Sequence, residues 1–296
     1  MILVTGATGS TGGHLVSQLK ARGSAFKALV RDRGKGDALG APYAVGDFAD
    51  PASLAAAMAG VDRVFLASPG AQGYLVDGEQ PMIRWERNVI DAAKAAGVRH
   101  VVKLSVWNAR IGGPMSEGGH GAVEAYLKES GLEWTMLQPG GYMQNFLRPE
   151  TSLGDEDGNL IGPEGDARVA FVDCFDIAAV AAELLTGDTG RNNSYVITGP
   201  EAVTYTEIAA KLSEGRGRPV GFRGEPARVI ADRLRGYGLD SQLADDLAGQ
   251  YASLGAGVYE EVTDVVERFT GRKPRDFDAF MAANPQAYPA LASSAR

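Results

Sequence analysis

Cysteine is nearly absent from this chain, because Cys174 is the single cysteine among 296 residues. No internal disulfide can form, which is typical of proteins that work in a reducing compartment. Cys174 is interpreted as a small buried hydrophobic residue or, alternatively, as a redox-sensitive thiol. Histidine is scarce as well, and His14, His100 and His120 lie far apart in the sequence. Without a cluster of cysteine and histidine, we predict no metal site.

Long hydrophobic runs and an excess of basic residues are also absent. No stretch approaches the roughly 18 consecutive apolar residues that a membrane-spanning helix needs. The first predicted strand begins at Ile2, so we expect no signal peptide and a cytoplasmic location. The 37 acidic and 29 basic residues give a formal net charge of −8. That charge argues against direct nucleic-acid binding, which needs a basic surface.

Glycine, in contrast, is concentrated near the start of the chain. The apolar run Ile2-Leu3-Val4 predicts a buried strand, and a helical pattern continues from His14. Between them, Gly6 would permit a tight turn, Gly9 would let backbone approach a pyrophosphate, and Gly12 would let helix and strand pack closely. Strand, glycine turn and helix in this order predict a dinucleotide-binding unit. An ordinary glycine-rich turn is the alternative.

The first half of the chain alternates between strand and helix patterns. Four further apolar segments predict strands, at residues 26–30, 44–45, 61–67 and 100–104. Helical patterns separate them, and a helix over 120–130 leads to a sixth strand at 132–137. This alternation predicts an α/β fold with a Rossmann-type, doubly wound parallel sheet. We place the dinucleotide-binding domain at residues 1–150, with a strand and helix near 169–200 returning to it.

Residues 151–296 predict a smaller lobe, mixed α/β and mostly helical, that binds the substrate. Residues 169–176 predict a strand that runs into a helix from Ile177. Thr204 and Glu207 have the spacing of a capping box and predict a helix start. Residues 219–222 predict a short strand, and helical patterns dominate from Pro226 onward.

The end of the second strand bears on the choice of cofactor. It carries Arg31, with Arg33 and Lys35 close behind. An acidic residue here would bind the ribose 2′-hydroxyl of NAD, whereas a guanidinium fits a 2′-phosphate. NADP(H) is therefore favoured over NAD(H), although Asp32 leaves NAD open. Asp47, at the end of the third strand, is either an adenine contact or a turn residue.

Characteristic motifs occur along nearly the whole chain, at residues 4–9, 46–51, 60–69, 88–97, 137–145, 198–208 and 263–277. Together they resemble the NmrA-like branch of atypical short-chain dehydrogenases/reductases, especially its quinone-reductase-like members. The resemblance implies a nicotinamide cofactor and a small-molecule substrate, and a homodimer is compatible with it. Such relatives include reductases of quinones, dyes and iminium compounds, and also NADP sensors that turn nothing over.

The usual proton-donating motif of the wider superfamily, Tyr-x-x-x-Lys, is absent, since none of the ten tyrosines has Lys four residues later. At the matching place stand His120 and Glu124, one helical turn apart. The resemblance implies that this pair is catalytic, with Ser105 at the end of the fifth strand. A carboxylate favours the imidazolium, so Glu124 is expected to keep His120 protonated near neutral pH as a general acid. A helix-stabilising pair and a turn serine are the alternatives.

Other contacts are assigned by position and resemblance. Cofactor contacts are expected at the glycine turn and the strand ends, from Gly6, Thr8, Gly9, Ser10, Thr11, Gly12, Arg31, Asp47, Phe48, Ser68, Pro69, Lys103, Pro139, Gly140 and Tyr142. Acceptor contacts are expected from Trp107, Tyr142, Met143 and Phe146, with core packing as the alternative for at least two of them. Lys103 shares a sheet face with Ser105 but is expected to lie too deep to react.

These observations predict an NADPH-dependent reductase that passes a hydride to a small conjugated acceptor such as a quinone. Two alternatives stay open at this point. One is an NADP(H)-sensing regulatory protein without turnover, and the other is a biosynthetic reductase of an imine or enone. Hydrolase chemistry is not expected, because Ser105 lacks the strand–turn–helix setting of a nucleophilic serine.

Overall fold

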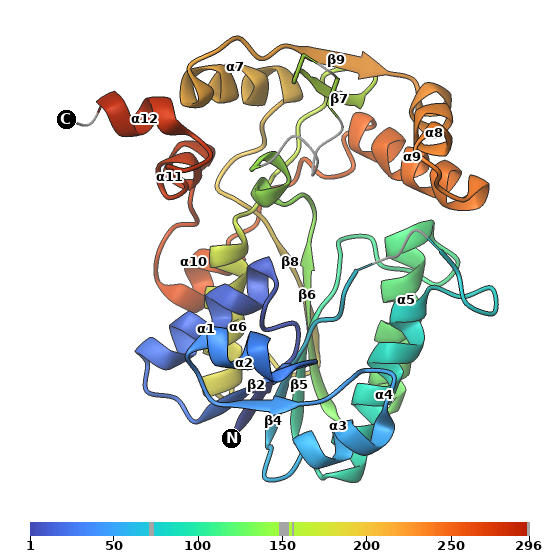
Figure 1. Cartoon of the computed structure of the whole chain (residues 1–296), viewed down its shortest axis with the longest axis vertical. Helices are drawn as coiled ribbons and strands as arrows, with labels where there is room; N and C mark the ends of the chain where they lie inside the picture. The colour runs from blue at the N-terminus through green and yellow to red at the C-terminus, as the bar shows by residue number, and fades with distance from the viewer. Residues whose placement is uncertain (71–73, 148–153, 156, 295–296) are drawn as a thin grey trace. The chain divides into compact units, whose positions relative to one another are not determined.

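The computed structural model describes residues 1–70, 74–147, 154–155 and 157–294, and it divides into two compact units (Figure 1). The first unit comprises Met1–Pro139, Cys174–Val196 and Arg268–Gly271. The second comprises Gly140–Asp173, Ile197–Glu267 and Arg272–Arg296. The predicted boundary at residue 150 lies outside the described residues, so the predicted domain limits stay a prediction.

The first unit is built on a seven-stranded sheet with the order β3-β2-β1-β4-β5-β6-β8. Its strands are β1 (Ile2–Val4), β2 (Phe26–Val30), β3 (Tyr43–Val45), β4 (Arg63–Leu66), β5 (His100–Leu104), β6 (Glu133–Pro139) and β8 (Asn193–Ile197). Every pair from β3 to β6 is parallel. The chain order reverses beside β1, at the type of switch point where doubly wound sheets bind ligands. The predicted Rossmann-type sheet is confirmed.

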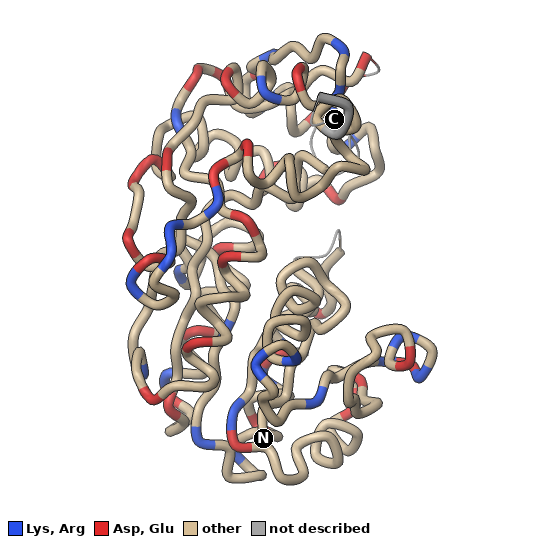
Figure 2. Tube along the Cα trace, turned by 90° about the vertical axis from the view of Figure 1, so that its left-hand side faces the viewer, with Lys and Arg blue, Asp and Glu red and all other residues tan. Residues whose placement is uncertain are grey.

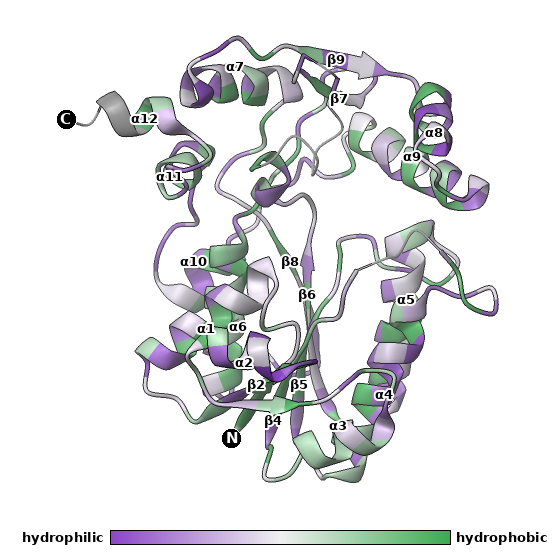
Figure 3. Ribbon diagram, in the orientation of Figure 1, coloured by the Kyte–Doolittle hydropathy of each residue, from purple (hydrophilic) through white to green (hydrophobic). Residues whose placement is uncertain are grey.

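Helices cover both faces of this sheet: α1 (Ser10–Ala21), α2 (Arg33–Leu39), α3 (Pro51–Ala57), α4 (Pro81–Ala95), α5 (Met115–Glu129) and α6 (Cys174–Thr186). Helices α3, α4 and α5 pack side by side on one face, and α1 packs against α6 on the other (Figure 1). In Figure 3, hydrophobic and hydrophilic residues alternate along α4 and α5, as expected of helices with one buried side.

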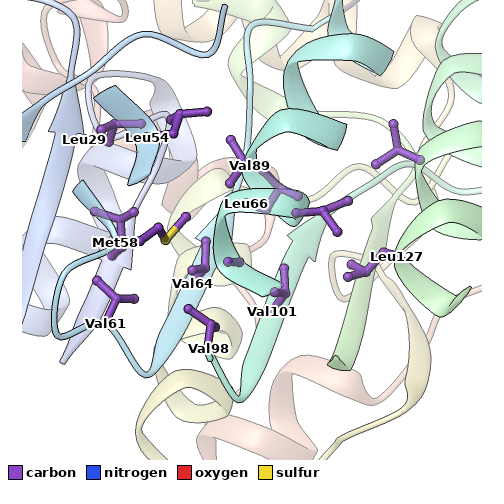
Figure 4. Close-up of a cluster of buried hydrophobic side chains, with 14 of the residues drawn as sticks. Leu29, Leu54, Met58, Val61, Val64, Leu66, Val89, Val98, Val101 and Leu127 are labelled. Atoms are coloured by element: carbon purple, nitrogen blue, oxygen red, sulfur yellow. The ribbon is translucent and has the colours of Figure 1, made fainter. Parts of the chain in front are cut away.

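A cluster of aliphatic side chains fills the space between the sheet and α3–α5 (Figure 4). Val64 and Leu66, two residues apart on β4, both face this layer, as the period of a strand requires. Val89 from α4 and Leu127 from α5 pack onto them and are at most 1% exposed. Burying one such side chain stabilises the fold by about 1.5–3 kcal/mol, so this layer fixes both helices against the sheet.

Side-chain caps begin several helices, and one of these helix starts was predicted. Asp50 caps α3 by accepting from the Ala52 N–H, with Pro51 in the first turn. Thr204 and Glu207 form the predicted capping box of α7 (Tyr205–Arg216). Helix α2 lies between β2 and β3, and its seven residues include two glycines, which are poor helix formers. Asp32 caps it by accepting from the Lys35 N–H.

The second unit has a parallel strand pair, β7 (Leu160–Pro163) with β9 (Phe222–Glu225). Its other elements are η1 (Met143–Phe146), α7 (Tyr205–Arg216), α8 (Ala227–Gly236), α9 (Ser241–Gly255), α11 (Phe277–Ala282) and α12 (Pro289–Ser294), while α10 (Val265–Thr270) is shared between the units. The prediction of a strand over 169–176 is wrong. Val169 and Val172 form only isolated bridges, because α6 begins at Cys174. The predicted strand at 219–222 begins only at Phe222.

His100, at the start of β5, is fully buried and makes stability depend on pH. Its Nε2 lies 2.9 Å from Thr135 Oγ1, and that hydroxyl donates to the Gly190 carbonyl at 2.8 Å. Nε2 therefore carries the proton, and Nδ1 has no partner among the described residues. Burial, followed by the charges of Arg191 and Arg63, lowers the pKa of His100 to about 4.

We expect stability to fall as pH drops from about 6.5, where a histidine of the unfolded chain gains its proton, to about 4. The unfolded state then binds more protons than the folded state, so the loss reaches on the order of 2–3 kcal/mol. Urea denaturation of the wild type and of His100→Gln at pH 7 and pH 4.5 measures it. The variant should lose less stability over this interval than the wild type and the control His14→Gln. Equal losses in all three would refute the prediction.

Candidate active site

The glycine turn between β1 and α1 has the backbone geometry that the sequence predicts. Gly6 has φ +60°, and a Cβ there would lie 2.7 Å from the Ala67 carbonyl oxygen. A Cβ on Gly12 would overlap the Gly6 carbonyl oxygen and lie 2.9 Å from Ala7 Cα. Thr5 ties the turn to the end of β4, because its hydroxyl accepts from the Ala67 N–H at 2.8 Å. Both positions therefore exclude any side chain.

The start of α1 fits a diphosphate. Helix α1 begins at Ser10, and its N-cap residue, Gly9, has no side chain to bond the first backbone N–H groups. Thr8, Gly9 and Ser10 are exposed, and the first N–H groups of the helix lie at the positive end of its dipole. Residues of this turn would hold the pyrophosphate of a nicotinamide dinucleotide, which stays a prediction for each contact.

The acidic residues near the predicted adenosine site already have local partners. The Asp32 carboxylate accepts from the Lys35 N–H at 2.9 Å and caps α2. Asp47 Oδ1 accepts from the Ala49 N–H at 2.8 Å, which is the turn role considered for it. Arg31 is exposed after β2, and Phe48 packs against the aliphatic layer. The predicted contact of Arg31 with a further phosphate stays a prediction.

Lys103, on β5, is the centre of a buried polar network on the α4–α5 side of the sheet. Its Nζ donates to Glu86 Oε2 at 2.6 Å and to the Leu104 carbonyl at 3.1 Å, and it lies 2.9 Å from His120 Nδ1. The Lys103 side chain is 0% exposed and that of Glu86 1%. Ser68, after β4, donates to Glu86 Oε1 at 2.8 Å. An ammonium has three N–H donors, and Glu86 Oε2, the Leu104 carbonyl and His120 Nδ1 use all three.

The contacts of Lys103 bear on its predicted role. All three N–H groups of Lys103 are used within the network. Its predicted contact with a cofactor stays a prediction. The depth expected from the sequence agrees with its complete burial.

The prediction that Glu124 keeps His120 protonated is wrong. An ammonium has no acceptor, so Nδ1 of His120 must accept from Lys103, and the neutral ring then carries its proton on Nε2. Burial, and then the positive charge of Lys103, lowers the pKa of His120 well below its usual value. The ring is therefore neutral near pH 7. His120 also lies in the second turn of α5, not at a helix start.

Glu124 serves Ser105 instead. The Ser105 hydroxyl donates to Glu124 Oε1 at 2.6 Å, and the Gln138 amide donates to the same oxygen at 2.8 Å. Lys128 lies 3.4 Å from Oε2. Ser105 and Lys103, two residues apart on β5, thus both reach α5, which confirms that they share a face of the sheet. The site holds two parallel pairs, Lys103 with His120 and Ser105 with Glu124.

The loop that follows β5 is packed tightly on the start of α5. A Cβ on Gly118 would overlap the Gly113 carbonyl oxygen, and one on Gly121 would overlap the Arg110 carbonyl. Arg110 also forms an ion pair with the buried Glu117. These backbone contacts on both sides of His120 fix the position of that residue relative to the loop after β5.

Sequence reasoning missed Glu86, although the sequence carries a signal for it. Met82, Ile83, Val89 and Ile90 form the buried side of α4, and Glu86 lies on that same side. A carboxylate in an apolar stripe needs a buried partner, because an unpaired buried charge is strongly destabilising. The identity of that partner, Lys103, depends on the tertiary fold.

The other predicted contact residues are divided between the two units. Pro139 ends β6, and its carbonyl accepts from the backbone N–H of the half-buried Trp107 at 2.9 Å. Gly140, Tyr142, Met143 and Phe146 belong to the second unit. Met143 is 3% and Phe146 2% exposed, and Phe146 packs on aromatic rings of that unit. Their predicted contacts, and those of Ser68 and Pro69 with a cofactor, stay predictions.

Two other properties of the described residues concern ligands and partners. No three His, Cys, Asp or Glu side chains in this part of the chain are grouped to hold a metal ion. Within the same ranges no helix is both long and apolar enough to cross a membrane. Acidic and basic residues are interspersed along the trace (Figure 2).

Comparisons with known proteins agree with this geometry. A sequence model of the NmrA-like family matches residues 1–281. The chain is 37% identical over 292 residues to the NAD(P)H azoreductase of Xenophilus azovorans, covering 97% of this chain and 99% of the relative. It is 32% identical over 253 residues to quinone oxidoreductase 2 of Escherichia coli K12, covering 84% and 86%. The structure of an NADPH-dependent quinone oxidoreductase from E. coli complexed with NADPH is similar, with a TM-score of 0.80, 29% identity, and 96% and 99% of the chains covered.

Proposed function

The chain belongs to the NmrA-like family, and from this premise we propose that this NAD(P)H-dependent oxidoreductase prefers NADPH and reduces a small conjugated acceptor such as a quinone. A quinone or an azo compound becomes reduced by gaining a hydride and a proton. The relatives named for these two acceptor classes support the proposal, because both classes are flat, conjugated and uncharged at the reacting atoms. The nicotinamide, when bound, supplies the hydride.

The observation that supports the proposal is the position of the His120 network, at the sheet edge that also bears the glycine turn. Gly6 follows β1, Ser68 follows β4 and Ser105 follows β5, and these three strands are neighbours in the sheet. The carboxyl ends of parallel strands meet at one edge, so the turn and the His120 network lie at the same edge of the first unit. His120 presents an Nε2–H there, which would donate to the oxygen or nitrogen on which negative charge develops.

A direct assay tests this function. The purified protein is mixed with NADPH and a panel of quinones, azo dyes, enones and imines, and the loss of nicotinamide absorbance is followed. We expect turnover with at least one quinone or azo dye. Turnover confined to imines or enones would point to a biosynthetic reductase. Tight NADPH binding without any turnover would overturn the reductase proposal in favour of a cofactor-sensing protein.

Arg31 should determine the preference for the phosphorylated cofactor. We expect Arg31→Ala to weaken NADPH binding by about 10–100-fold, because a charge-assisted hydrogen bond contributes about 1.5–3 kcal/mol, and to change NADH binding by less than about threefold. Calorimetric titration of both cofactors measures the ratio. Arg22→Ala, which removes a surface arginine paired with Glu183, is the matched control. Equal effects on the two cofactors would contradict the assignment of Arg31 to the 2′-phosphate.

A further inference from the structure

The Lys103 ammonium is held in one orientation by groups from three different elements. Glu86 comes from α4, the Leu104 carbonyl from β5 itself, and His120 from α5. Lys103 and Glu86 are together removed from water, so their ion pair is not weakened by solvent. His120 Nδ1 supplies the third acceptor that a fully buried ammonium needs, so the two side chains are held against each other.

We propose that Lys103 is both the positioning residue that holds His120 as the neutral Nε2–H tautomer and the source of the proton that His120 delivers. This inference rests on the proposed reductase function and names the path of its proton. Neutral imidazole alone is a very weak acid. The Lys103 ammonium removes that difficulty, because it can protonate Nδ1 while Nε2 loses its proton.

The proton transfer balances without any other group. As the acceptor gains its hydride, the Nε2–H bond of His120 breaks and its proton moves to the acceptor. At the same time an Nζ–H bond of Lys103 breaks and that proton moves to Nδ1. His120 remains neutral as the other tautomer, and Lys103 becomes a neutral amine. After the product leaves, a proton from solvent adds to Nε2, and the Nδ1 proton returns to Lys103.

Other charged groups near His120 already have partners of their own. These are Glu117 with Arg110, Glu124 with Ser105, Gln138 and Lys128, and Glu86 with Ser68 and Lys103. Burial and the Lys103 charge both hold the pKa of His120 low. Activity should therefore not follow the titration of an ordinary imidazole.

The experiment combines NMR of the resting protein with pH profiles of kcat. Protein labelled with 15N in histidine is compared with His120→Gln, so that the His120 signals are assigned. For the wild type at pH 7 we expect a neutral ring protonated on Nε2, and a kcat that is flat from pH 6 to pH 8. In Lys103→Met we expect the Nε2–H preference to be lost, the ring to titrate at higher pH than in the wild type, and kcat at pH 8 to fall by about 10–100-fold.

Lys103→Met leaves the Glu86 carboxylate buried without its charged partner, which could destabilise the fold. A second variant therefore removes both charges together. Glu86→Gln combined with Lys103→Met removes both charges and should show the same loss of tautomer preference and of kcat. Lys27→Met removes a lysine that donates to the Ala59 carbonyl, far from the site in the sheet, and should change neither readout. Circular dichroism verifies that each variant is folded.

The outcomes separate the two proposals. An imidazolium, or an Nδ1–H ring, for His120 in the wild type would overturn the role of Lys103 even if quinones are reduced. A wild-type kcat that falls as pH rises, with a midpoint near pH 6.5, would also overturn that role. A His120 tautomer that is unchanged in both Lys103 variants would overturn it as well. If no acceptor is turned over although the tautomer depends on Lys103, the positioning role stands and the proposed function fails.

Discussion

His120→Gln should reduce kcat with the preferred acceptor by about 10²–10⁴-fold, the usual contribution of a positioned general acid. The glutamine side chain cannot relay a proton, although its amide can still contact Lys103. NADPH binding should change by less than about threefold, since His120 lies in the polar network on α5 and not in the glycine turn. Steady-state kinetics with saturating NADPH, together with calorimetric titration of the cofactor, measure the two effects.

His14→Gln is the matched control for this substitution. His14 lies on α1 and its ring packs edge-on against Phe175, 5.6 Å between centroids. Its replacement should leave kcat within about twofold of the wild type. If His120→Gln also kept wild-type turnover across all acceptors, the imidazole would have no part in the chemistry and water would be the proton donor.

Gly12→Val should abolish measurable NADPH binding and lower the free energy of unfolding by about 3 kcal/mol or more. The new Cβ would overlap the Gly6 carbonyl oxygen and lie 2.7 Å from the Gly6 carbonyl carbon. Both are backbone atoms of the turn itself, so relief requires moving α1 away from β1, and overpacking of this kind usually destabilises by 1–3 kcal/mol, occasionally more. Displacing the turn also misdirects the N–H groups at the start of the helix.

Gly13→Ala provides a neighbouring control with the opposite sign. A Cβ on Gly13 would meet its nearest atom, the Ala7 carbonyl oxygen, at 3.8 Å. Because Gly13 lies inside α1, alanine should stabilise the helix by about 0.5–1 kcal/mol. Chemical denaturation and cofactor titration of both variants check the contrast. Near-normal NADPH binding by folded Gly12→Val would show that the turn does not hold the pyrophosphate.

The sheet was predictable because each of its central strands corresponds to a short apolar run in the sequence. Short apolar runs such as Phe26–Val30 and His100–Leu104 are typical of central parallel strands, and the structure has both strands at those bounds. The glycine turn was predictable because Gly6 and Gly12 satisfy steric needs that no other residue meets. Helix limits were less accurate. Helix α5 begins at Met115, ahead of the predicted start at residue 120.

The partners within the site could not be read from the sequence. His120 and Glu124 do lie one turn apart, as predicted, but adjacency on a helix does not decide which tertiary partner each side chain meets. Lys103 and Ser105 reach α5 from β5 and separate the two roles. The pKa of His120 moves in the opposite direction from the prediction, because burial and a lysine outweigh a nearby carboxylate that is already bonded elsewhere.

The glycines that flank His120 also bear on how this enzyme can diversify. Gly118 and Gly121 bring the loop after β5 into backbone contact with α5, so that loop packs directly on the helix that carries His120. Under the proposed role of His120, substitutions that reshape this loop would shift the proton-donating imidazole along with it. Laboratory evolution that alters the loop would then have to compensate for a displaced imidazole.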